Sequence, residues 1–164
     1  MSDNFTNVSS KLKDIIDGLD KKNEYEFHLN CVSGADVTSR FGDVENIQYH
    51  NDESLMITCI DDKRKGIAST NNLSDESITS TIEKSKKIAS YLEADSHQGL
   101  AKENLINELD IDCSINFPKK FSTDQLVEMT VACEKSALDF DTRINNSEGS
   151  EYGYSQSKNL ILNS

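Results

Sequence analysis

Three histidines and four cysteines are the residues of this chain whose side chains are best suited to hold a metal ion. Zinc sites usually take such ligands in closely spaced pairs. His28, His50 and His97 lie far from one another, and the chain has no H-E-x-x-H run and no C-x-x-C pair. We therefore expect solvent-exposed histidines, with His28 on the outward face of a strand, His50 beside a turn and His97 in a linker.

The carboxylates and the possible nucleophiles also show no spacing that is typical of a metal-binding or catalytic site. Asp61 with Asp62, and Asp110 with Asp112, could bind a divalent cation, but no twelve-residue calcium loop surrounds either pair. The nucleophile motif G-x-S-x-G does not occur, and the glycines do not gather into a phosphate-binding loop. Cys59 is interpreted as a small core residue rather than a reactive thiol. The sequence therefore predicts no catalytic, cofactor-binding or metal-binding residue.

The charge balance argues against several classes of partner. The formal net charge is −12, from 29 acidic and 17 basic residues. Binding to nucleic acids or to anionic membranes depends on cationic patches. Basic residues cluster only briefly here, at 63–65, 84–87 and 119–120. We therefore expect no direct nucleic-acid binding and no membrane association.

The cysteines and the N-terminal residues predict a cytoplasmic protein. Cys31, Cys59, Cys113 and Cys133 are scattered through the chain, and no apolar stretch near Met1 resembles a signal peptide. No apolar run is long enough to span a bilayer. Reduced thiols inside a cell are the simplest account, and two disulfides are the less favoured alternative.

The hydrophobic pattern predicts an α+β domain over residues 1–92. Apolar residues at helical spacing indicate one helix over 9–20 and another over 75–92. Alternating or β-branched runs indicate about five strands, at 24–31, 35–41, 44–49, 55–60 and 65–70. Short turns, at Ser33-Gly34 and at 51–53 among others, make neighbouring strands antiparallel. The expected fold is a β-meander with its helices on one face.

Residues 93–121 predict a linker. Polar residues dominate this stretch, hydrophobic periodicity is lost, and the only proline, Pro118, lies there. A short helix over 102–108 is the one element expected within it.

Residues 122–164 predict the start of a second α+β domain, apparently truncated in this chain. Ser122 and Gln125 form a capping box that opens a helix to about residue 140. Two extended runs around a turn at Gly149 follow, and they predict a hairpin. The last apolar run, at 159–162, is expected to lack neighbouring strands.

Three sequence runs, in this order and spacing, resemble the TldD/PmbA family. They are SRFGDVENIQY at 39–49, RKGIAST at 64–70 followed by NLS at 72–74, and RINNSEG at 143–149. The resemblance extends from about Glu24 to Ser164. The first and last runs are similar to the N-terminal part of the PmbA-type, or TldE-type, subunit of this family.

The resemblance implies a cytoplasmic TldD–TldE heterodimer that acts as a metallopeptidase. Such complexes cleave peptides, including modified peptide precursors and an unfolded antitoxin, and an older description calls the proteins modulators of DNA gyrase. Zinc is implied in the TldD-like partner, on a His-Glu-x-x-x-His helix that this chain lacks. No catalytic or metal residue is therefore carried over, and no cofactor is expected in this segment.

The positions that match the family also have structural explanations. They are Arg40, Gly42, Glu45, Asn46, Gly66, Arg143, Glu148 and Gly149. The glycines suit turns or close strand contacts. Arg40 with Glu45 could form a cross-strand ion pair, and Arg143 with Glu148 another across the predicted hairpin.

Two classes of function remain open from the sequence. The first is a structural or partner-binding segment of a PmbA-type subunit, which packs on a TldD-like partner and helps to enclose a peptide chamber. A peptide substrate could also pair with an exposed strand edge. The alternative is a stand-alone, non-enzymatic interaction module with an acidic surface. A truncated product without activity is a third interpretation.

Overall fold

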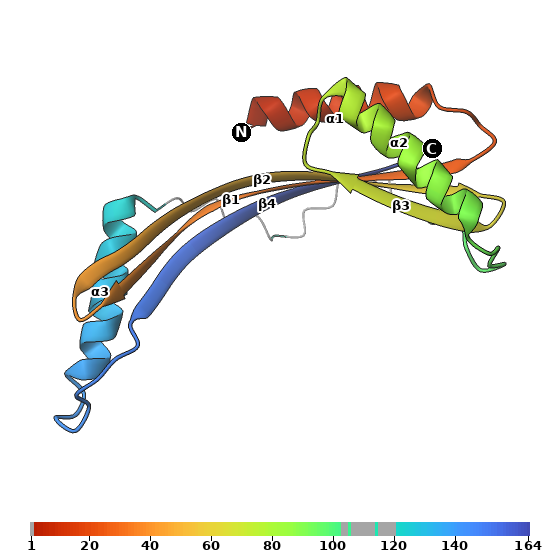
Figure 1. Ribbon diagram of the computed structural model, residues 1–164. Helices are drawn as coiled ribbons and strands as arrows, with labels where there is room; N and C mark the ends of the chain where they lie inside the picture. The colour runs from red at the N-terminus through yellow and green to blue at the C-terminus, as the bar shows by residue number, and fades with distance from the viewer. Residues whose placement is uncertain (1, 103–104, 106–113, 115–120) are drawn as a thin grey trace. The chain divides into compact units, whose positions relative to one another are not determined.

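A computed structural model describes residues 2–102, 105, 114 and 121–164 of the chain. Within them the order of elements is α1 (Ser2–Asp17), β1 (Glu24–Arg40), β2 (Asp43–Asp61), β3 (Arg64–Thr70), α2 (Asp75–Tyr91), α3 (Thr123–Leu138) and β4 (Ser150–Asn163). The strands form one sheet in the order β3-β2-β1-β4 (Figure 1). The predicted α+β class with an antiparallel sheet is confirmed. Pro118 and most of the predicted helix over 102–108 lie outside the described residues.

The sheet has four strands, so the prediction of about five was wrong. β1 and β2 each continue without a break through a predicted turn, at Ser33-Gly34 and at 51–53. Gly34 serves a close strand contact instead, because a Cβ atom there would collide with the carbonyl oxygen of Tyr154 and lie 2.5 Å from Nε2 of His50. The polar residues at 51–53 reflect largely exposed side chains on β2 rather than a change of direction.

The C-terminal extended residues form one strand, not the predicted hairpin. Residues 141–149 contain turns and irregular backbone, and β4 then lies beside β1. The N–H of Ser164 donates to the carbonyl oxygen of Tyr25 at 3.0 Å, and the Ser164 hydroxyl accepts from the Tyr25 N–H at 2.9 Å. Leu160 and Leu162 pack against the buried cluster of the same sheet. The last apolar run therefore has β1 as a strand neighbour, and the prediction that it lacks neighbouring strands was wrong.

The residues divide into two compact units, and β1, β2 and β4 each contribute to both. The first unit comprises Met1–Cys31, Asp52–Ile111 and Lys158–Ser164, and the second comprises Val32–Asn51 and Asp112–Ser157. The division of the chain into domains at 1–92, 93–121 and 122–164 stays a prediction.

The core of the first unit follows the alternation predicted for 24–31. Its buried side chains are Leu12, Ile16, Tyr25, Phe27, Leu29, Leu55, Ile57, Cys59, Ile78 and Ile82. They come from one face of β1 and β2 and from α1 and α2, which lie on that face in Figure 1. α1 begins at Ser2, well before its predicted start. β3 lies close under α2, because a Cβ atom on Gly66 would collide with the carbonyl oxygen of Ser85.

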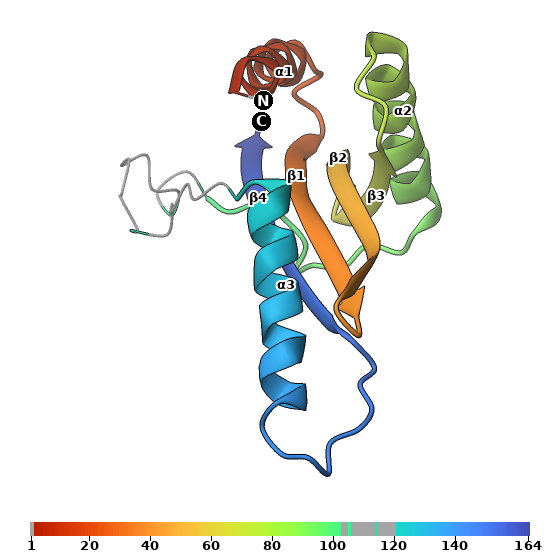
Figure 2. The ribbon, with the colours of Figure 1, turned by 90° about the vertical axis from the view of Figure 1, so that its left-hand side faces the viewer.

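The second unit has a smaller core between β1, β4 and α3. Its buried apolar residues are Ala35, Val37 and Leu126, with Phe121, Val127, Tyr152 and Tyr154 packed around them. Figure 2 shows α3 alongside the neighbouring ends of β1 and β4, and the Ser150 hydroxyl of β4 donates a hydrogen bond to the backbone carbonyl oxygen of Thr130 on α3 at 2.6 Å. The predicted capping box is confirmed, since Ser122 and Gln125 each accept a hydrogen bond from the other's backbone N–H.

Candidate partner-binding surface

Two family-like runs that are far apart in the chain, 39–49 and 143–149, meet in the second unit. Nε of Arg40 donates to the carbonyl oxygen of Ser147 at 3.1 Å. Gly149, with φ +100°, lies against the carbonyl oxygen of Ser39, at a separation too short for any Cβ atom. These two contacts hold the end of β1 against the residues that precede β4.

Glu134 of α3 binds the turn between β1 and β2. Its Oε1 accepts from the N–H of Phe41 at 2.9 Å, and its Oε2 accepts from the N–H of Gly42 at 3.2 Å. The N–H of Phe41 contributes most to holding the pKa of the Glu134 carboxyl below its ordinary value, against the opposing effect of burial. The Ser147 hydroxyl, the N–H of Gly42 and the charge of Arg40 lower the pKa further. The carboxylate is thus ionised, buried and fully engaged.

The turn itself has an unusual residue in it. Phe41 and Gly42 both have positive φ, +52° and +83°, which is the geometry of a two-residue hairpin turn that prefers Asn-Gly or Gly-Gly. A bulky residue in this region costs about 1–3 kcal/mol and persists only where its surroundings impose it. The Phe41 side chain is 55% exposed, with the Arg40 guanidinium 5.5 Å from its ring centroid. Glu134 therefore holds an exposed aromatic ring at the tip of the hairpin.

Neither ion pair predicted from the family-like positions is among those that the described residues form. Arg40 reaches Ser147 instead of Glu45. Arg143 forms a two-bond contact with Asp141 instead of Glu148, at 2.9 Å from Nε and 2.7 Å from Nη2. The second prediction failed because residues 141–149 do not form a hairpin, so Glu148 does not lie across a strand pair from Arg143.

His50 was predicted beside a turn, but it lies within β2. Its Nδ1 is 3.3 Å from Oδ2 of Asp36 on β1. The ring rests over Gly34, and Asp36 rests over Gly153 of β4, because a Cβ atom on either glycine would collide with these side chains. Two glycines on neighbouring strands therefore make room for one His–Asp contact.

The other two histidines lie as expected. His28 is on β1 with its side chain near Asn159, where Nε2 is 3.3 Å from Oδ1. It is partly exposed, and His97 is exposed in the connection that follows α2. Neither lies in a cluster with other potential ligands: within the described ranges, no group of three or more His, Cys, Asp and Glu side chains could hold a metal ion.

The three described cysteines differ in burial: Cys31 is partly buried, Cys59 is buried and Cys133 is exposed. Cys59 is fully buried in the first core, as predicted, and burial raises the pKa of its thiol. Cys31, Cys59 and Cys133 are free thiols, whereas Cys113 and the Asp110–Asp112 pair lie outside the described residues.

Asp61 and Asp62 each contact a cation of the chain, Lys22 and Arg64 respectively. No described helix is long and apolar enough to cross a membrane.

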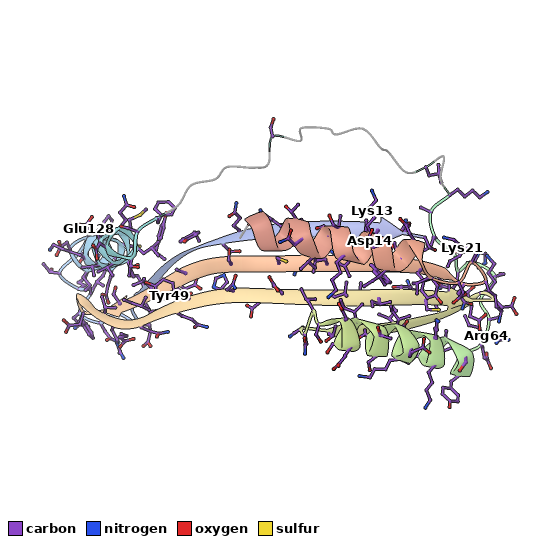
Figure 3. The ribbon with its side chains drawn as sticks, turned by 90° about the horizontal axis from the view of Figure 1, so that it is seen from above. Lys13, Asp14, Lys21, Tyr49, Arg64 and Glu128 are labelled. Atoms are coloured by element: carbon purple, nitrogen blue, oxygen red, sulfur yellow. The ribbon has the colours of Figure 1, made fainter. Side chains whose placement is uncertain are left out.

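Within the part of the chain that the structure describes, β2 has an open edge over residues 43–51 of the second unit. β3 pairs with β2 only from Leu55 to Asp61, and β1 occupies the other side. Side chains 43–49 are exposed on both faces of the strand, including Val44 at 40%, Ile47 at 41% and Tyr49 at 66%. Figure 3 labels Tyr49, whose hydroxyl contacts the Thr123 hydroxyl at the start of α3. This part of β2 therefore offers both main-chain groups and apolar side chains to a partner.

The second unit is also strongly acidic. Its described residues include ten carboxylates and only three basic side chains. Lys135 contacts Asp139 at 2.7 Å, Arg143 is held by Asp141, and Arg40 by Ser147. The three cations are thus engaged locally, and most of the negative charge is left to act on a partner.

No sequence motif marked Glu134 as a candidate functional residue. A signal was present, since Leu126, Thr130 and Glu134 lie at successive four-residue intervals on the buried stripe of α3. A carboxylate at such a position needs hydrogen-bond donors from elsewhere in the fold. The position of Glu134 on this stripe predicts that hydrogen-bond donors lie near its carboxylate. It does not indicate that these donors belong to the turn between β1 and β2.

Comparison with protein families identifies the class to which this fold and surface belong. Residues 32–89 match the family described as PmbA/TldA metallopeptidase domain 1. The chain is 33% identical over 132 residues to Metalloprotease PmbA of Escherichia coli O157:H7, and 33% identical over 127 residues to a Metalloprotease PmbA homolog of Haemophilus influenzae. The chain belongs to the TldD/PmbA family.

The likeness covers most of this chain but a minor part of each relative. The two alignments cover 80% and 77% of this chain, and 29% and 28% of the relatives. The chain therefore spans under a third of the length of the curated relatives it matches.

Solved structures have the same fold. The crystal structure of TldE from Thermococcus kodakarensis superposes with a TM-score of 0.73 and 22% identity, over 96% of this chain and 35% of that chain. A Thermotoga maritima protein described as a candidate modulator of a DNA gyrase gives 0.70 and 14% identity, over 97% of this chain and 35% of that one. At these identities the likeness shows the fold alone.

Proposed function

We propose that this chain is a structural, partner-binding part of a PmbA-type subunit, which packs on a TldD-like subunit of a cytoplasmic metallopeptidase. The observation that carries the proposal is the 33% identity to Metalloprotease PmbA across 80% of the chain. In this assembly the zinc ion and the residues that cleave peptides belong to the TldD-like partner. This chain contributes surface, and its role is to bind the partner and to help enclose the peptide substrate.

The geometry of the second unit supports a binding role. The β1–β2 turn is fixed by Glu134, and the adjoining part of β2 is exposed on both faces. A preordered surface loses little conformational freedom when it binds, so more of its contact energy appears as affinity. Glu134 therefore supports binding by keeping the hairpin in one shape.

Co-purification with a TldD-like subunit tests the proposal. We expect a stable complex of defined stoichiometry by size-exclusion chromatography with light scattering, and peptidase activity that depends on this chain. The Glu134→Gln variant should weaken the complex, and Glu128→Gln on the exposed side of the same helix is the matched control. If the wild-type chain does not associate and the partner's activity is unchanged by it, the subunit role is wrong.

Metal analysis supplies a separate prediction. We expect no stoichiometric zinc on this chain after purification and dialysis, because the proposal assigns the zinc site to the partner. Elemental analysis of the chain and of a TldD-like subunit in parallel checks it. Tightly bound zinc at one ion per chain would contradict the assignment.

A stand-alone interaction module is the second candidate function. The acidic second unit with its open strand edge favours it, since both features attract a partner without any enzyme. Association with a protein other than a TldD-like subunit, with no effect on peptidase activity, would distinguish this function from the first.

A further inference from the structure

No described strand pairs with the outer side of β2 over 43–51, so its main-chain groups there have no strand partner within the described residues. The neighbours of β2 among the described strands are β1 and β3, and β3 reaches no further than Leu55. A strand with one free side offers alternating N–H and C=O groups to an extended peptide. Edge strands are commonly shielded by charged side chains, especially lysine, by prolines or by a covering element. This stretch carries the acidic Asp43 and Glu45 but no Lys, Arg or Pro.

The side chains of this edge define what would complement it. Asp43 and Glu45 are exposed and lie on one face of the strand, because alternate residues point the same way. Val44, Ile47 and Tyr49 are also exposed, so both faces of this part of the strand carry apolar side chains. Opposite charges on paired strands attract and like charges repel. A strand with cationic side chains and with apolar residues between them therefore complements both the acidic pair and the apolar side chains of this edge.

The geometry points to a binding site for an extended peptide segment that carries lysine or arginine, and we propose that this segment adds to β2 over 43–51 as a further strand. A second copy of this chain is a poorer occupant, since residues 43–51 hold no Lys or Arg and His50 already faces Asp36. The three basic side chains among the described residues of the second unit are held by Asp139, Asp141 and Ser147. Charge complementarity therefore favours a separate, basic chain.

The hairpin tip supports the same site. Glu134 fixes Phe41 and Gly42 directly before the first residue of β2. The exposed Phe41 ring stands beside the acidic end of the edge, where it can cover an apolar side chain of the peptide. This inference does not rest on the subunit role proposed above, because the chain alone should bind the peptide.

Binding can be measured with three labelled peptides of about nine residues, which is the length of the free edge. The first alternates Lys with Val and Thr, the second replaces each Lys by Glu, and the third is the first with N-methyl groups on alternate amides. By fluorescence anisotropy with the whole chain, we expect the first peptide to bind, and the other two to bind at least about tenfold more weakly. Equal binding of the N-methylated peptide would overturn strand addition, and equal binding of the Glu peptide would overturn the charge argument.

Charge reversal on the protein locates the site. We expect Asp43→Lys with Glu45→Lys to weaken the Lys peptide about tenfold, because two attractive cross-strand pairs become repulsive. Glu128→Lys with Glu151→Lys makes the same change of net charge on exposed positions of α3 and β4, neither of which pairs with β2 (Figure 3 labels Glu128), and should weaken binding by no more than about twofold. Equal losses in both variants would mean that only the overall charge matters. If the edge variant does not fold, Asp43→Asn with Glu45→Gln tests the same point.

Amide hydrogen exchange by NMR identifies the strand that pairs. On addition of the Lys peptide, alternate amides within 43–51 should gain protection, and amides of 150–157 on β4 should not. Protection confined to β4 would overturn the site. Protection of 43–51 without peptide, together with a dimer by analytical ultracentrifugation, would assign the edge to a second copy of this chain and overturn the basic occupant.

Discussion

Glu134 connects a helix to a strand turn through charge and hydrogen bonding at once. Its two oxygens accept from two successive backbone N–H groups, while its side chain is almost fully buried at 3% exposure. A buried carboxylate with donors on both oxygens keeps its charge, whereas the same group without them would take up a proton. The stability of the hairpin tip should therefore depend on pH through this one residue.

The first prediction concerns that dependence. The pKa of Glu134 lies below its ordinary value of 4.5 in the folded chain. A lowered pKa stabilises the fold above the unfolded value, and this contribution is lost as the pH falls through the folded pKa. Glu134→Gln should lower the melting temperature by several degrees near pH 7, because the amide can accept from only one N–H and faces the other with its own donors. The difference from wild type should shrink as the pH falls below 4.5 and through the lowered pKa of the folded chain.

Thermal unfolding monitored by circular dichroism across this pH range checks the prediction. Glu128→Gln is the control, since it removes a carboxylate from the exposed side of the same helix. A difference between Glu134→Gln and wild type that is constant with pH would show that the charge of Glu134 is not what stabilises the turn.

Gly34 supports a second prediction at the residue scale. A Cβ atom there would collide with the carbonyl oxygen of Tyr154 on one side and the His50 ring on the other. Since the backbone of β4 cannot retreat without disturbing its pairing, Gly34→Ala should destabilise the chain by about 1–3 kcal/mol. Urea unfolding measures this. Gly99→Ala is the matched control, because its new methyl group would make only ordinary contacts, the nearest at 3.6 Å.

At the scale of elements, β4 closes the first core although it is far from α1 and β1 in the chain. Leu160 and Leu162 face the buried cluster, while Ile161 between them points away and is 59% exposed. Because alternate residues of β4 face the core and the solvent, a substitution at Ile161 is a control for the same substitution at Leu160.

The third prediction uses that alternation. Leu160→Ala should destabilise the chain by about 1–3 kcal/mol, below the range for a fully buried leucine because this one is partly exposed. Ile161→Ala should change the free energy of unfolding by no more than about 0.5 kcal/mol. Equal losses in the two variants by urea unfolding would show that β4 does not present alternate faces to core and solvent.

Much of the element pattern was predictable from local sequence, and the failures share a cause. The alternation of 24–31 and the capping box of Ser122 and Gln125 depend on neighbouring residues, and both were predicted correctly. Gly34 was interpreted as a turn because its true reason, the approach of Tyr154, comes from a distant part of the chain. The C-terminal hairpin failed similarly, since the partner of β4 is β1 and not its own preceding residues.

The candidate surface was less predictable than the fold. The runs 39–49 and 143–149, on which the resemblance rests, meet in the second unit, but the ion pairs expected there for Arg40 and Arg143 are not formed among the described residues. The contacts that do form involve a backbone carbonyl and a nearby carboxylate, and neither has a periodic sequence signal. The open edge of β2 depends on where β3 ends, which is a property of the sheet and not of residues 43–51.

At the scale of the whole molecule, the net charge of −12 sets both solubility and stability. A large net charge keeps a protein soluble, but its self-repulsion opposes the compact state. Among the described residues of the second unit, most of the negative charge has no neighbouring cation to offset it, since the three basic side chains described there already contact Asp139, Asp141 and Ser147.

The fourth prediction follows from screening. Raising sodium chloride from about 0.01 M to about 0.5 M shortens the Debye length from roughly 30 Å to under 10 Å, so the melting temperature should rise by a few degrees. Glu128→Lys with Glu148→Lys should respond less, because it has less charge to screen. Chloride is the appropriate salt, since sulfate would strengthen apolar burial by itself. A melting temperature that falls with salt would show that attractive ion pairs outweigh the repulsion.

The position of β4 in the sheet also bears on how the protein is made. β1 is an inner strand, yet its second neighbour is residues 150–163, which leave the ribosome long after β1 and β2. Until then the growing chain has an apolar sheet with one flank uncovered, and such pairings of high contact order form slowly. A nascent chain arrested before Ser150 should therefore depend on chaperones, and full protection of β1 should appear only when Leu160 and Leu162 have emerged.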